Sequence, residues 1–244
     1  HQKLRITATV RYRSVNEPVT LYVFIKNEKA VSLYERLGFV IVETIKDSRY
    51  IMKRDNRKYY AAYEERYKTA HANGVSWLSK VSTPIVMEVI DKYKINRQHR
   101  MLEIGCGEGR DSKTVLEHGF PLMATDISEE AVTYCKQQLP RYSNHFSVLD
   151  CLSDRLEEKF DFIFSIAVVH MLVVDEDRDG FYQFIRNHLS ANGIALICAM
   201  GNGEIEIQSD ISAAYTLQER NHESGKMMVA GTSCRMVSWN TLES

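Results

Sequence analysis

The stretch MLEIGCGEGR (Met101–Arg110) places three glycines at alternate positions directly behind an apolar run. This pattern predicts a buried strand, a tight turn and the start of a helix, with the backbone of the turn left bare for a ligand to approach. Such a turn can hold a dinucleotide pyrophosphate, a nucleoside triphosphate or a nucleoside without phosphate. The residues around the turn decide between these ligands.

The composition excludes several classes of protein. The 244 residues are 44% hydrophobic and 26% charged, as in an ordinary globular chain. The longest apolar runs fall far short of the roughly 20 residues that cross a bilayer, so we expect no membrane partner. A formal net charge of −1 does not favour a nucleic-acid partner.

The cysteines and histidines predict neither a disulfide framework nor a metal site. The five cysteines are an odd number and contain no Cys-x-x-Cys pair, which is typical of reduced thiols in the cytoplasm. The eight histidines show no spacing that is typical of metal ligands. We therefore expect a cytoplasmic protein that binds no metal.

Two segments meet near the charged run KRDNRK at residues 53–58. In the first segment, 1–54, Val19–Ile25 predicts a strand and Asn27–Gly38 a helix that ends at its glycine. Two further strands, 39–45 and 48–54, can pair as a hairpin. We expect a small βαββ unit here and a second domain at 55–244.

The second domain opens with a helix that places three tyrosines, Tyr60, Tyr63 and Tyr67, on one face. This face either packs in the core or covers a ligand as a lid. Another helix begins at Pro84, with Thr83 as its N-cap.

Beyond that helix, strand and helix patterns alternate. The predicted strands are Arg100–Ile104, Leu122–Thr125, His145–Leu149, Phe160–Ser165 and Ile194–Met200. The predicted helices are Gly109–Glu117, Glu129–Gln138 and Arg178–Leu189, the last followed by a left-handed cap at 191–193. The alternation predicts an α/β fold, with a doubly wound, Rossmann-like parallel sheet covered by helices on both faces.

The glycine turn departs from both phosphate-binding patterns. The third glycine comes one residue early for a dinucleotide fingerprint, and Arg110 takes the fingerprint position. No Gly-Lys-Ser/Thr follows, which excludes a triphosphate loop.

Three carboxylates surround the turn: Glu103 precedes it, Asp126 ends the second strand and Asp150 ends the third. They would repel a pyrophosphate but attract a ligand with an ammonium group, a cationic sulfur and free ribose hydroxyls. The sequence therefore predicts S-adenosylmethionine as the ligand.

Each expected contact follows from its position in the sheet. Asp126 accepts hydrogen bonds from the ribose, and Ile127 beside it packs on the adenine. Asp150 receives the adenine amino group, with Cys151 next to it. The remaining expected contacts lie in the turn, at the fourth strand and on the tyrosine face: Gly105, Cys106, Gly107, Ser165 and Tyr67.

His170 follows the fourth strand, near where a methyl acceptor would lie. It is either a general base or a packed, hydrogen-bonded side chain. It is our one catalytic candidate.

With these residues in place, residues 62–244 resemble the class I S-adenosylmethionine-dependent methyltransferases. Within that class they resemble most the small-molecule branch that includes the tellurite-resistance and thiopurine methyltransferases. The motifs that carry the resemblance are YEERYKTAHANGVSW, LEIGCGEGRDS, ATDIS and FDFIFSIAVVHML. The resemblance implies a small-molecule methyl acceptor and cofactor contacts at Glu103, Gly105, Gly107, Asp126 and Asp150.

The end of the chain departs from the family pattern. The family's sheet has a sixth and a seventh strand after a helix that here begins at SWNTLE (residues 238–243), but the sequence stops at Ser244. We expect either a truncated chain or a sheet that another chain completes, for example in a homo-oligomer.

Residues 1–54 resemble the carboxyl-terminal part of the GNAT-type N-acetyltransferases through LYVFIKNEKAVSLYERLGF. In that family, the residue at the position of Tyr34 often protonates the thiolate of coenzyme A. The family holds the coenzyme pyrophosphate on a glycine-rich turn before this strand, whereas the first glycine here is Gly38. We therefore expect a partial, structural unit.

The sequence thus predicts an S-adenosylmethionine-dependent methyltransferase that holds a small nucleophile in line with the methyl group. Two alternatives stay open. One is an acetyltransferase, or a protein with both activities of which this chain is a part. The other is a non-catalytic S-adenosylmethionine-binding module.

Overall fold

The structure is a computed structural model that describes residues 18–77 and 81–243. The chain divides into two compact units, His1–Lys58 and Tyr59–Ser244. The boundary falls directly after the charged run at residues 53–58. Within the described residues, no helix is both long and apolar enough to span a bilayer.

The smaller unit is an antiparallel sheet with one helix. Its strands β1 (Val19–Phe24), β3 (Arg49–Arg54) and β2 (Val40–Ile45) lie in the order β1-β3-β2. Helix α1 (Glu28–Arg36) links β1 to β2, and a small core of Val23, Phe39 and Met52 is buried in this unit. The pairing of β2 with β3 confirms the predicted hairpin.

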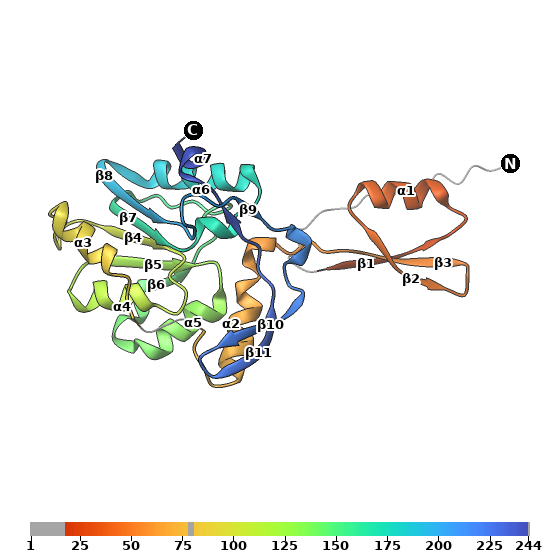
Figure 1. The fold of residues 1–244 in the computed structure, drawn as a ribbon, viewed down its shortest axis with the longest axis horizontal. Coiled ribbons are helices and arrows are strands. Elements are labelled where there is room, and N and C mark those ends of the chain that lie inside the picture. The colour runs from red at the N-terminus through yellow and green to blue at the C-terminus, as the bar shows by residue number, and fades with distance from the viewer. Residues whose placement is uncertain (1–17, 78–80, 244) are drawn as a thin grey trace. The chain divides into compact units, whose positions relative to one another are not determined.

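The larger unit is built on a five-stranded parallel sheet in the order β6-β5-β4-β7-β8 (Figure 1). This arrangement confirms the predicted α/β fold with a Rossmann-like parallel sheet. The strands in chain order are β4 (Met101–Ile104), β5 (Leu122–Asp126), β6 (Phe146–Val148), β7 (Phe160–Ile166) and β8 (Leu189–Cys198).

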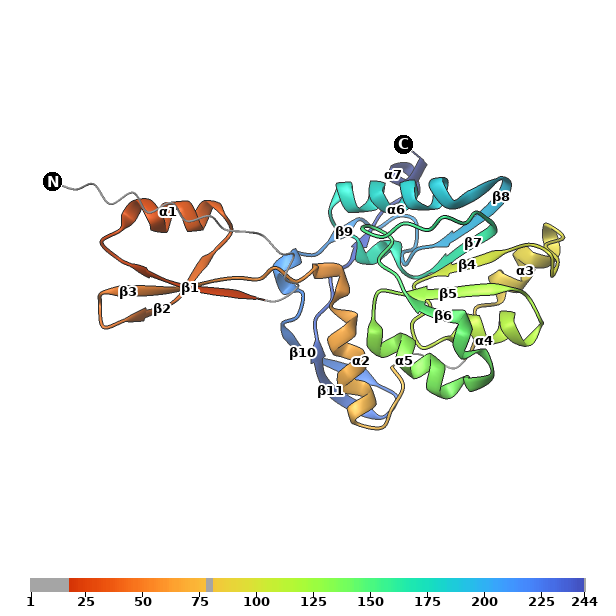
Figure 2. The same ribbon diagram turned by 180° about the vertical axis from the view of Figure 1, so that it is seen from behind.

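Helices cover both faces of this sheet, as Figures 1 and 2 show. One core cluster joins the strands to α3 (Pro84–Lys92), α4 (Arg110–Glu117) and α5 (Glu129–Gln138). A second cluster joins them to α6 (Asp175–His188) on the opposite face. The chain ends in the short helix α7 (Trp239–Glu243).

The central strand β4 shows why the sheet is buried on both sides. Side chains alternate across a strand, so Met101 packs toward α3, α4 and α5 while Leu102 and Ile104 pack toward α6. All of β4 is buried, including the carboxyl side chain of Glu103. The glycine turn therefore begins where the fully buried strand β4 ends.

The tyrosine-bearing helix differs from the prediction. It is split into a 3₁₀ turn, η1 (Tyr59–Ala61), and helix α2 (Tyr63–Ala72). Three further 3₁₀ turns are η2 (Pro140–His145), η3 (Val169–Met171) and η4 (Ile211–Ala213).

The predicted left-handed cap at 191–193 is wrong. Helix α6 ends at His188, and Leu189 is already extended, with φ −78° and ψ 137°, so that β8 begins there. The register against β7 then shifts, because Leu189 pairs with Phe160 but Ile194 pairs with Phe162. Gly193 lies in this irregular stretch, where a Cβ would come within 3.0 Å of the Phe160 carbonyl oxygen. Gly193 is therefore required because the backbone of Phe160 approaches it closely, and not because it caps a helix.

Four short strands after β8 were not predicted: β9 (Ile207–Gln208), β10 (Leu217–His222), β11 (Gly225–Ala230) and β12 (Arg235–Met236). The β10–β11 hairpin lies beside α2 in both ribbon views (Figures 1 and 2). In the described part of the chain, none of these strands joins the five-stranded sheet.

Candidate functional site

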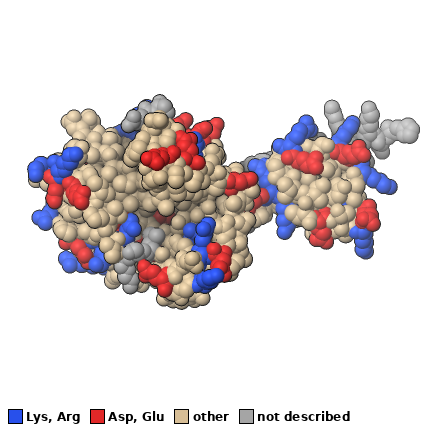
Figure 3. All heavy atoms as spheres, viewed as in Figure 1, with Lys and Arg blue, Asp and Glu red and all other residues tan. Residues whose placement is uncertain are grey.

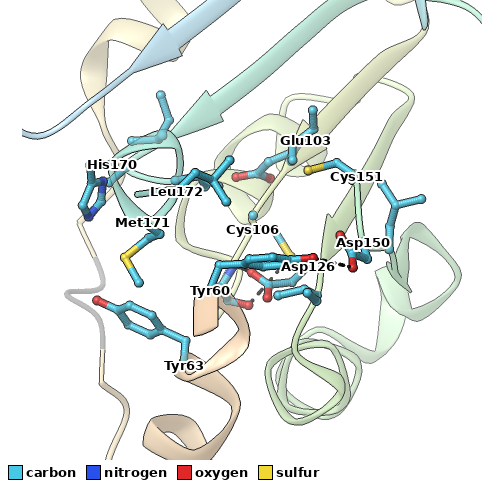
Figure 4. Close-up of a pocket in the computed structure, with 18 of the residues that line it drawn as sticks. Tyr60, Tyr63, Glu103, Cys106, Asp126, Asp150, Cys151, His170, Met171 and Leu172 are labelled. Carbon is cyan, nitrogen blue, oxygen red and sulfur yellow. Dashed lines mark hydrogen bonds between the residues drawn. The ribbon is translucent and has the colours of Figure 1, made fainter. Parts of the chain in front are cut away.

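A pocket of about 240 Å³ lies at the carboxyl end of the parallel sheet. This is the edge at which doubly wound folds bind their ligands. Figure 4 shows its lining side chains, which come from the glycine turn, the ends of β5, β6 and β7, and the two tyrosine-bearing segments. Ten of the eleven residues predicted as site residues line it: Tyr67, Glu103, Gly105, Cys106, Gly107, Asp126, Ile127, Asp150, Cys151 and His170.

The glycine turn requires glycine where it approaches β7. Gly105 has φ +77°, and a Cβ there would lie 2.2 Å from a methyl carbon of Val168. The N–H groups of Gly105 and Cys106 both donate to the Thr125 carbonyl at 2.8 Å. The turn is therefore fixed to β5, with its backbone open toward the pocket.

Asp126 is held by the turn that it faces. Gly107 N–H donates to its Oδ2 and Ser128 N–H to its Oδ1, both at 2.8 Å. The carboxyl is only 8% exposed, and burial raises its pKa despite these hydrogen bonds. A carboxylate oxygen accepts more than one hydrogen bond, so the group can still receive a ligand hydroxyl.

Asp150 is fixed at the opposite end of the pocket from His170, as Figure 4 shows. Leu152 N–H donates to its Oδ1 at 2.9 Å, and the Tyr60 hydroxyl donates to its Oδ2 at 3.3 Å. Burial raises the pKa of the neighbouring Cys151 thiol to about 12, which keeps that thiol protonated.

Glu103 lies beneath the turn and is 2% exposed. Burial raises the pKa of its carboxyl to about 8, and a hydrogen bond from the Ser112 hydroxyl offsets part of this rise. The group is therefore mainly protonated at neutral pH, unlike the carboxylate that the sequence predicts.

The three tyrosines lie together at the pocket, as their common helical face predicts. Tyr60, Tyr63 and Tyr67 all line the pocket, and Tyr67 is also buried in the protein interior. Tyr63 and Tyr67 pack with their rings 5.5 Å apart. This face of α2 therefore packs ring against ring and also lines the pocket.

Ser165 lies outside the pocket lining. Its side chain is buried, and its hydroxyl donates to the Ile104 carbonyl at 2.9 Å, so it links β7 to β4. Ile166, the next residue, lines the pocket.

His170 lies in η3 and is 5% exposed. Among the described residues, its buried Nδ1 has no hydrogen-bond partner. Burial, together with the nearby Arg178 guanidinium, lowers its pKa to about 4. The side chain is therefore a neutral imidazole, and it lacks the internal hydrogen bond that a purely packed histidine would make at Nδ1.

The sequence analysis missed Arg110 as a site residue. Its Nη2 pairs with Asp111 Oδ2 at 2.9 Å, while its Nε is buried without a partner among the described residues. The only sequence signal was its position directly after the third glycine, where a helix begins and side chains can turn back to the ligand.

Within the described residues, no cluster of three or more His, Cys, Asp and Glu side chains is arranged to hold a metal ion.

Comparison with known proteins agrees with this geometry. Residues 102–195 match a family model described as "Methyltransferase domain". The chain is 27% identical over 120 residues to a probable S-adenosyl-L-methionine-dependent methyltransferase TehB of Haemophilus influenzae, which covers 48% of this chain and 42% of that protein. It is 30% identical over 128 residues to a malonyl-[acyl-carrier protein] O-methyltransferase of Bacillus anthracis. This match covers 50% of this chain and 45% of that protein. The chain therefore spans less than half the length of these curated relatives.

Solved structures share the fold at low sequence identity. An S-adenosylmethionine-dependent methyltransferase from Clostridium acetobutylicum superposes with a TM-score of 0.51 at 15% identity, covering 75% of this chain and 84% of that one. The CcbJ methyltransferase of Streptomyces caelestis superposes with a TM-score of 0.53 at 12% identity, covering 76% and 84%. Residues 102–195 thus match the methyltransferase family model, and the sheet around them has the Rossmann-like fold that is seen in solved structures of S-adenosylmethionine-dependent methyltransferases.

Proposed function

We propose that the larger unit binds S-adenosylmethionine in the pocket above β4 and transfers its methyl group to a small-molecule acceptor. The observation that carries this proposal is the meeting of Asp126 and Asp150 with the glycine turn around one pocket, which the protonated Glu103 also lines. Acidic side chains repel phosphate and favour a ligand with cationic groups and free hydroxyls. The family match and the names of the curated relatives support the same cofactor.

The residues present fit this cofactor. Asp126 offers acceptor positions to the ribose hydroxyls, and Asp150 offers them to the adenine amino group. The buried Arg110 Nε is a donor that a ligand carboxylate, such as that of the methionine part, would satisfy. When bound, the cofactor supplies an electrophilic methyl group on a cationic sulfur.

The protein's own part is mainly positioning. Tyr60 orients Asp150, and the backbone of Gly105 allows close approach of the ligand. Transfer of this kind needs the acceptor in line with the methyl group at close distance. His170 stays the proposed general base because it lines the pocket and its Nδ1 has no hydrogen-bond partner among the described residues, but the lowered pKa makes it a weak base.

A small acceptor fits the site better than nucleic acid. On the face seen in Figure 3, acidic and basic side chains are interspersed over each unit and do not form the continuous basic stripe typical of nucleic-acid binding. Five free cysteines support the cytoplasmic location that the sequence predicts.

Calorimetry with S-adenosylmethionine and S-adenosylhomocysteine tests the cofactor. Asp126→Ala is expected to weaken binding by about 1–3 kcal/mol, because it removes acceptors for the ribose hydroxyls. Asp91→Ala, which removes an exposed carboxylate of α3 outside the pocket, is the matched control and should bind like wild type. A folded wild-type protein that binds neither ligand would contradict the proposal.

Measurement of catalytic turnover distinguishes the methyltransferase from a non-catalytic binding module. A non-catalytic module would bind S-adenosylmethionine but form no S-adenosylhomocysteine with any acceptor. The resemblance of residues 1–54 to GNAT-type acetyltransferases stays a prediction, and titration with acetyl-coenzyme A tests it.

A further inference from the structure

Two of the five cysteines lie together at the glycine turn. Cys106 belongs to the turn itself, and Cys135 lies in α5. Their sulfur atoms share one hydrogen-bond acceptor, the carbonyl oxygen of Gly107, which is 3.7 Å from Cys106 Sγ and 3.2 Å from Cys135 Sγ. Interaction with the Cys135 thiol, ahead of burial, raises the pKa of Cys106 well above its usual value. The two thiols are therefore neighbours, although they are far apart in the chain.

The Cys135 sulfur packs directly against the turn. A Cβ at Gly109 would lie only 3.0 Å from Cys135 Sγ, so the third glycine leaves room for this sulfur. Both cysteines belong to the core cluster that joins the sheet to α3, α4 and α5. The turn and α5 are thus in contact through sulfur.

The two thiols differ in their access to the pocket. Cys106 is one of the lining residues, and Figure 4 shows it among them, whereas Cys135 is not part of the lining. Cys106 is 4% exposed and Cys135 is 0% exposed. A small reagent that enters the pocket therefore reaches the Cys106 sulfur first.

A bond between these sulfur atoms would move the turn. An S–S bond is about 2.05 Å long, and two thiols that are not bonded lie farther apart, so bond formation draws the turn toward α5. The N–H of Gly107, next to Cys106, donates to Asp126 Oδ2 at 2.8 Å. Movement of the turn would disturb this hydrogen bond and the backbone that faces the pocket.

We propose that Cys106 and Cys135 are a modification site, a pair of thiols that a hydroperoxide in the pocket oxidises to a disulfide. The Cys106 sulfur attacks one oxygen of hydrogen peroxide, the O–O bond breaks, and a sulfenic acid and one water form. The Cys135 sulfur then attacks the sulfenic sulfur, and the displaced hydroxide leaves with the thiol proton as a second water. The pair loses two electrons and two protons, and the peroxide is reduced to two waters. A dithiol reductant restores both thiols.

The surroundings of the pair make this oxidation slow. The thiolate is the reactive form of a cysteine, and the raised pKa of Cys106 keeps that form rare. We therefore expect the disulfide to form over minutes to hours, the usual range for uncatalysed disulfide chemistry. Such a pair responds to sustained exposure to an oxidant, as reversible disulfides in reducing compartments do.

Peptide mapping of the full chain tests the site directly. The protein is treated with hydrogen peroxide, its remaining thiols are blocked, and it is digested without reductant. We expect a linked pair of peptides that carry Cys106 and Cys135, lighter by two hydrogens than the free peptides and absent after dithiothreitol treatment. Near-ultraviolet circular dichroism confirms that the treated protein is folded. A folded, treated protein without this linked pair, or with Cys106 joined to Cys151 instead, overturns the inference.

Two serine variants test the role of each thiol. Cys135→Ser removes the thiol that closes the disulfide, so Cys106 should accumulate as sulfinic acid under the same treatment. Cys151→Ser is the matched control, because it removes the other thiol that lines the pocket, and it should form the linked pair like wild type. An unmodified Cys106 in the Cys135 variant would contradict the proposed order of attack. Loss of the linked pair in the Cys151 variant would contradict the proposed pairing.

The effect on cofactor binding rests on the proposed function and has its own measurements. S-adenosylhomocysteine at about ten times its Kd should slow disulfide formation about tenfold, because it leaves about a tenth of the pockets free. The oxidised protein should bind this ligand at least about tenfold more weakly, and dithiothreitol should restore the affinity. Equal affinities of the reduced and oxidised proteins would refute the effect on binding.

The two proposals fail in different ways. If the linked pair forms but the reduced protein binds no S-adenosylhomocysteine, the modification site stands and the proposed function is wrong. If the reduced protein binds S-adenosylhomocysteine but peroxide forms no linked pair, the proposed function stands and the modification site is wrong.

Discussion

At the base of the pocket, Glu103 carries a proton at neutral pH although the sequence implies a charged group. The unfolded chain releases this proton near the ordinary value of 4.5, but burial raises the pKa to about 8 in the folded protein. Between these values the native state binds more protons than the unfolded state. The free energy of unfolding therefore falls as pH rises through this window.

Glu103→Gln is expected to remove this contribution, because a glutamine does not titrate. The wild-type protein should lose up to about 1.4 kcal/mol of stability per pH unit relative to the variant between pH 5 and 8. Urea unfolding of both proteins across this range measures the difference. Parallel stability curves would show that Glu103 is ionised in the folded protein.

Sequence reasoning found the residues whose position follows from strand ends. Asp126 ends β5 and Asp150 follows the end of β6 by two residues, and parallel strands end at the same edge of a sheet. It missed Arg110 and the hydrogen bond from Tyr60 to Asp150, because these contacts depend on how a helix start and a 3₁₀ turn fold back over that edge. It also predicted a contact from the backbone at Ser165–Ile166, where Ile166 lines the pocket and the Ser165 side chain bonds to β4.

At the scale of elements, a set of polar contacts attaches α2 to the site. Glu64 Oε2 accepts from the Ser128 hydroxyl at 2.6 Å and from the Glu130 N–H at 3.1 Å, at the start of α5. His71 bridges two carboxyl groups, with Nε2 2.8 Å from Glu108 of the glycine turn and Nδ1 2.7 Å from Glu130. These contacts hold the tyrosine face of α2 over the pocket.

His71→Ala is expected to loosen α2, because it removes the bridge and leaves two carboxyl groups facing each other. Affinity for S-adenosylhomocysteine should fall about tenfold, and amide exchange in α2 should become faster. The exposed His118 at the end of α4 supplies the control His118→Ala, which should leave both unchanged. Wild-type exchange rates in the His71 variant would mean that apolar packing alone holds α2.

The elements that follow β8 show where local patterns fail. Ala-Asn-Gly after a helical stretch is typical of a helix end, but the helix has already ended at His188 and the glycine lies in a strand irregularity. The β10–β11 hairpin is exposed along much of its length, so its sequence carries little alternation of apolar and polar residues. Its place beside α2 depends on tertiary contacts, such as the Arg66 guanidinium that donates to the Ala230 carbonyl.

At the scale of the whole molecule, the candidate site belongs to one unit. Every residue that lines the pocket lies at Tyr60 or later, whereas the smaller unit ends at Lys58. The smaller unit has a core of its own around Val23, Phe39 and Met52. The pocket is therefore built, as far as the described residues 18–77 and 81–243 show, without any side chain of the smaller unit.

Removal of residues 1–54 is accordingly expected to leave cofactor binding intact. The Kd for S-adenosylhomocysteine should stay within about threefold of the value for the full chain, or about 0.7 kcal/mol. Calorimetry on both proteins measures it, and a cooperative thermal transition in the shortened protein confirms that the larger unit is folded. Asp126→Ala in the shortened protein should weaken binding as much as in the full chain, since the ribose contact is the same. A folded shortened protein that no longer binds the ligand would show that residues 1–54 contribute to the site.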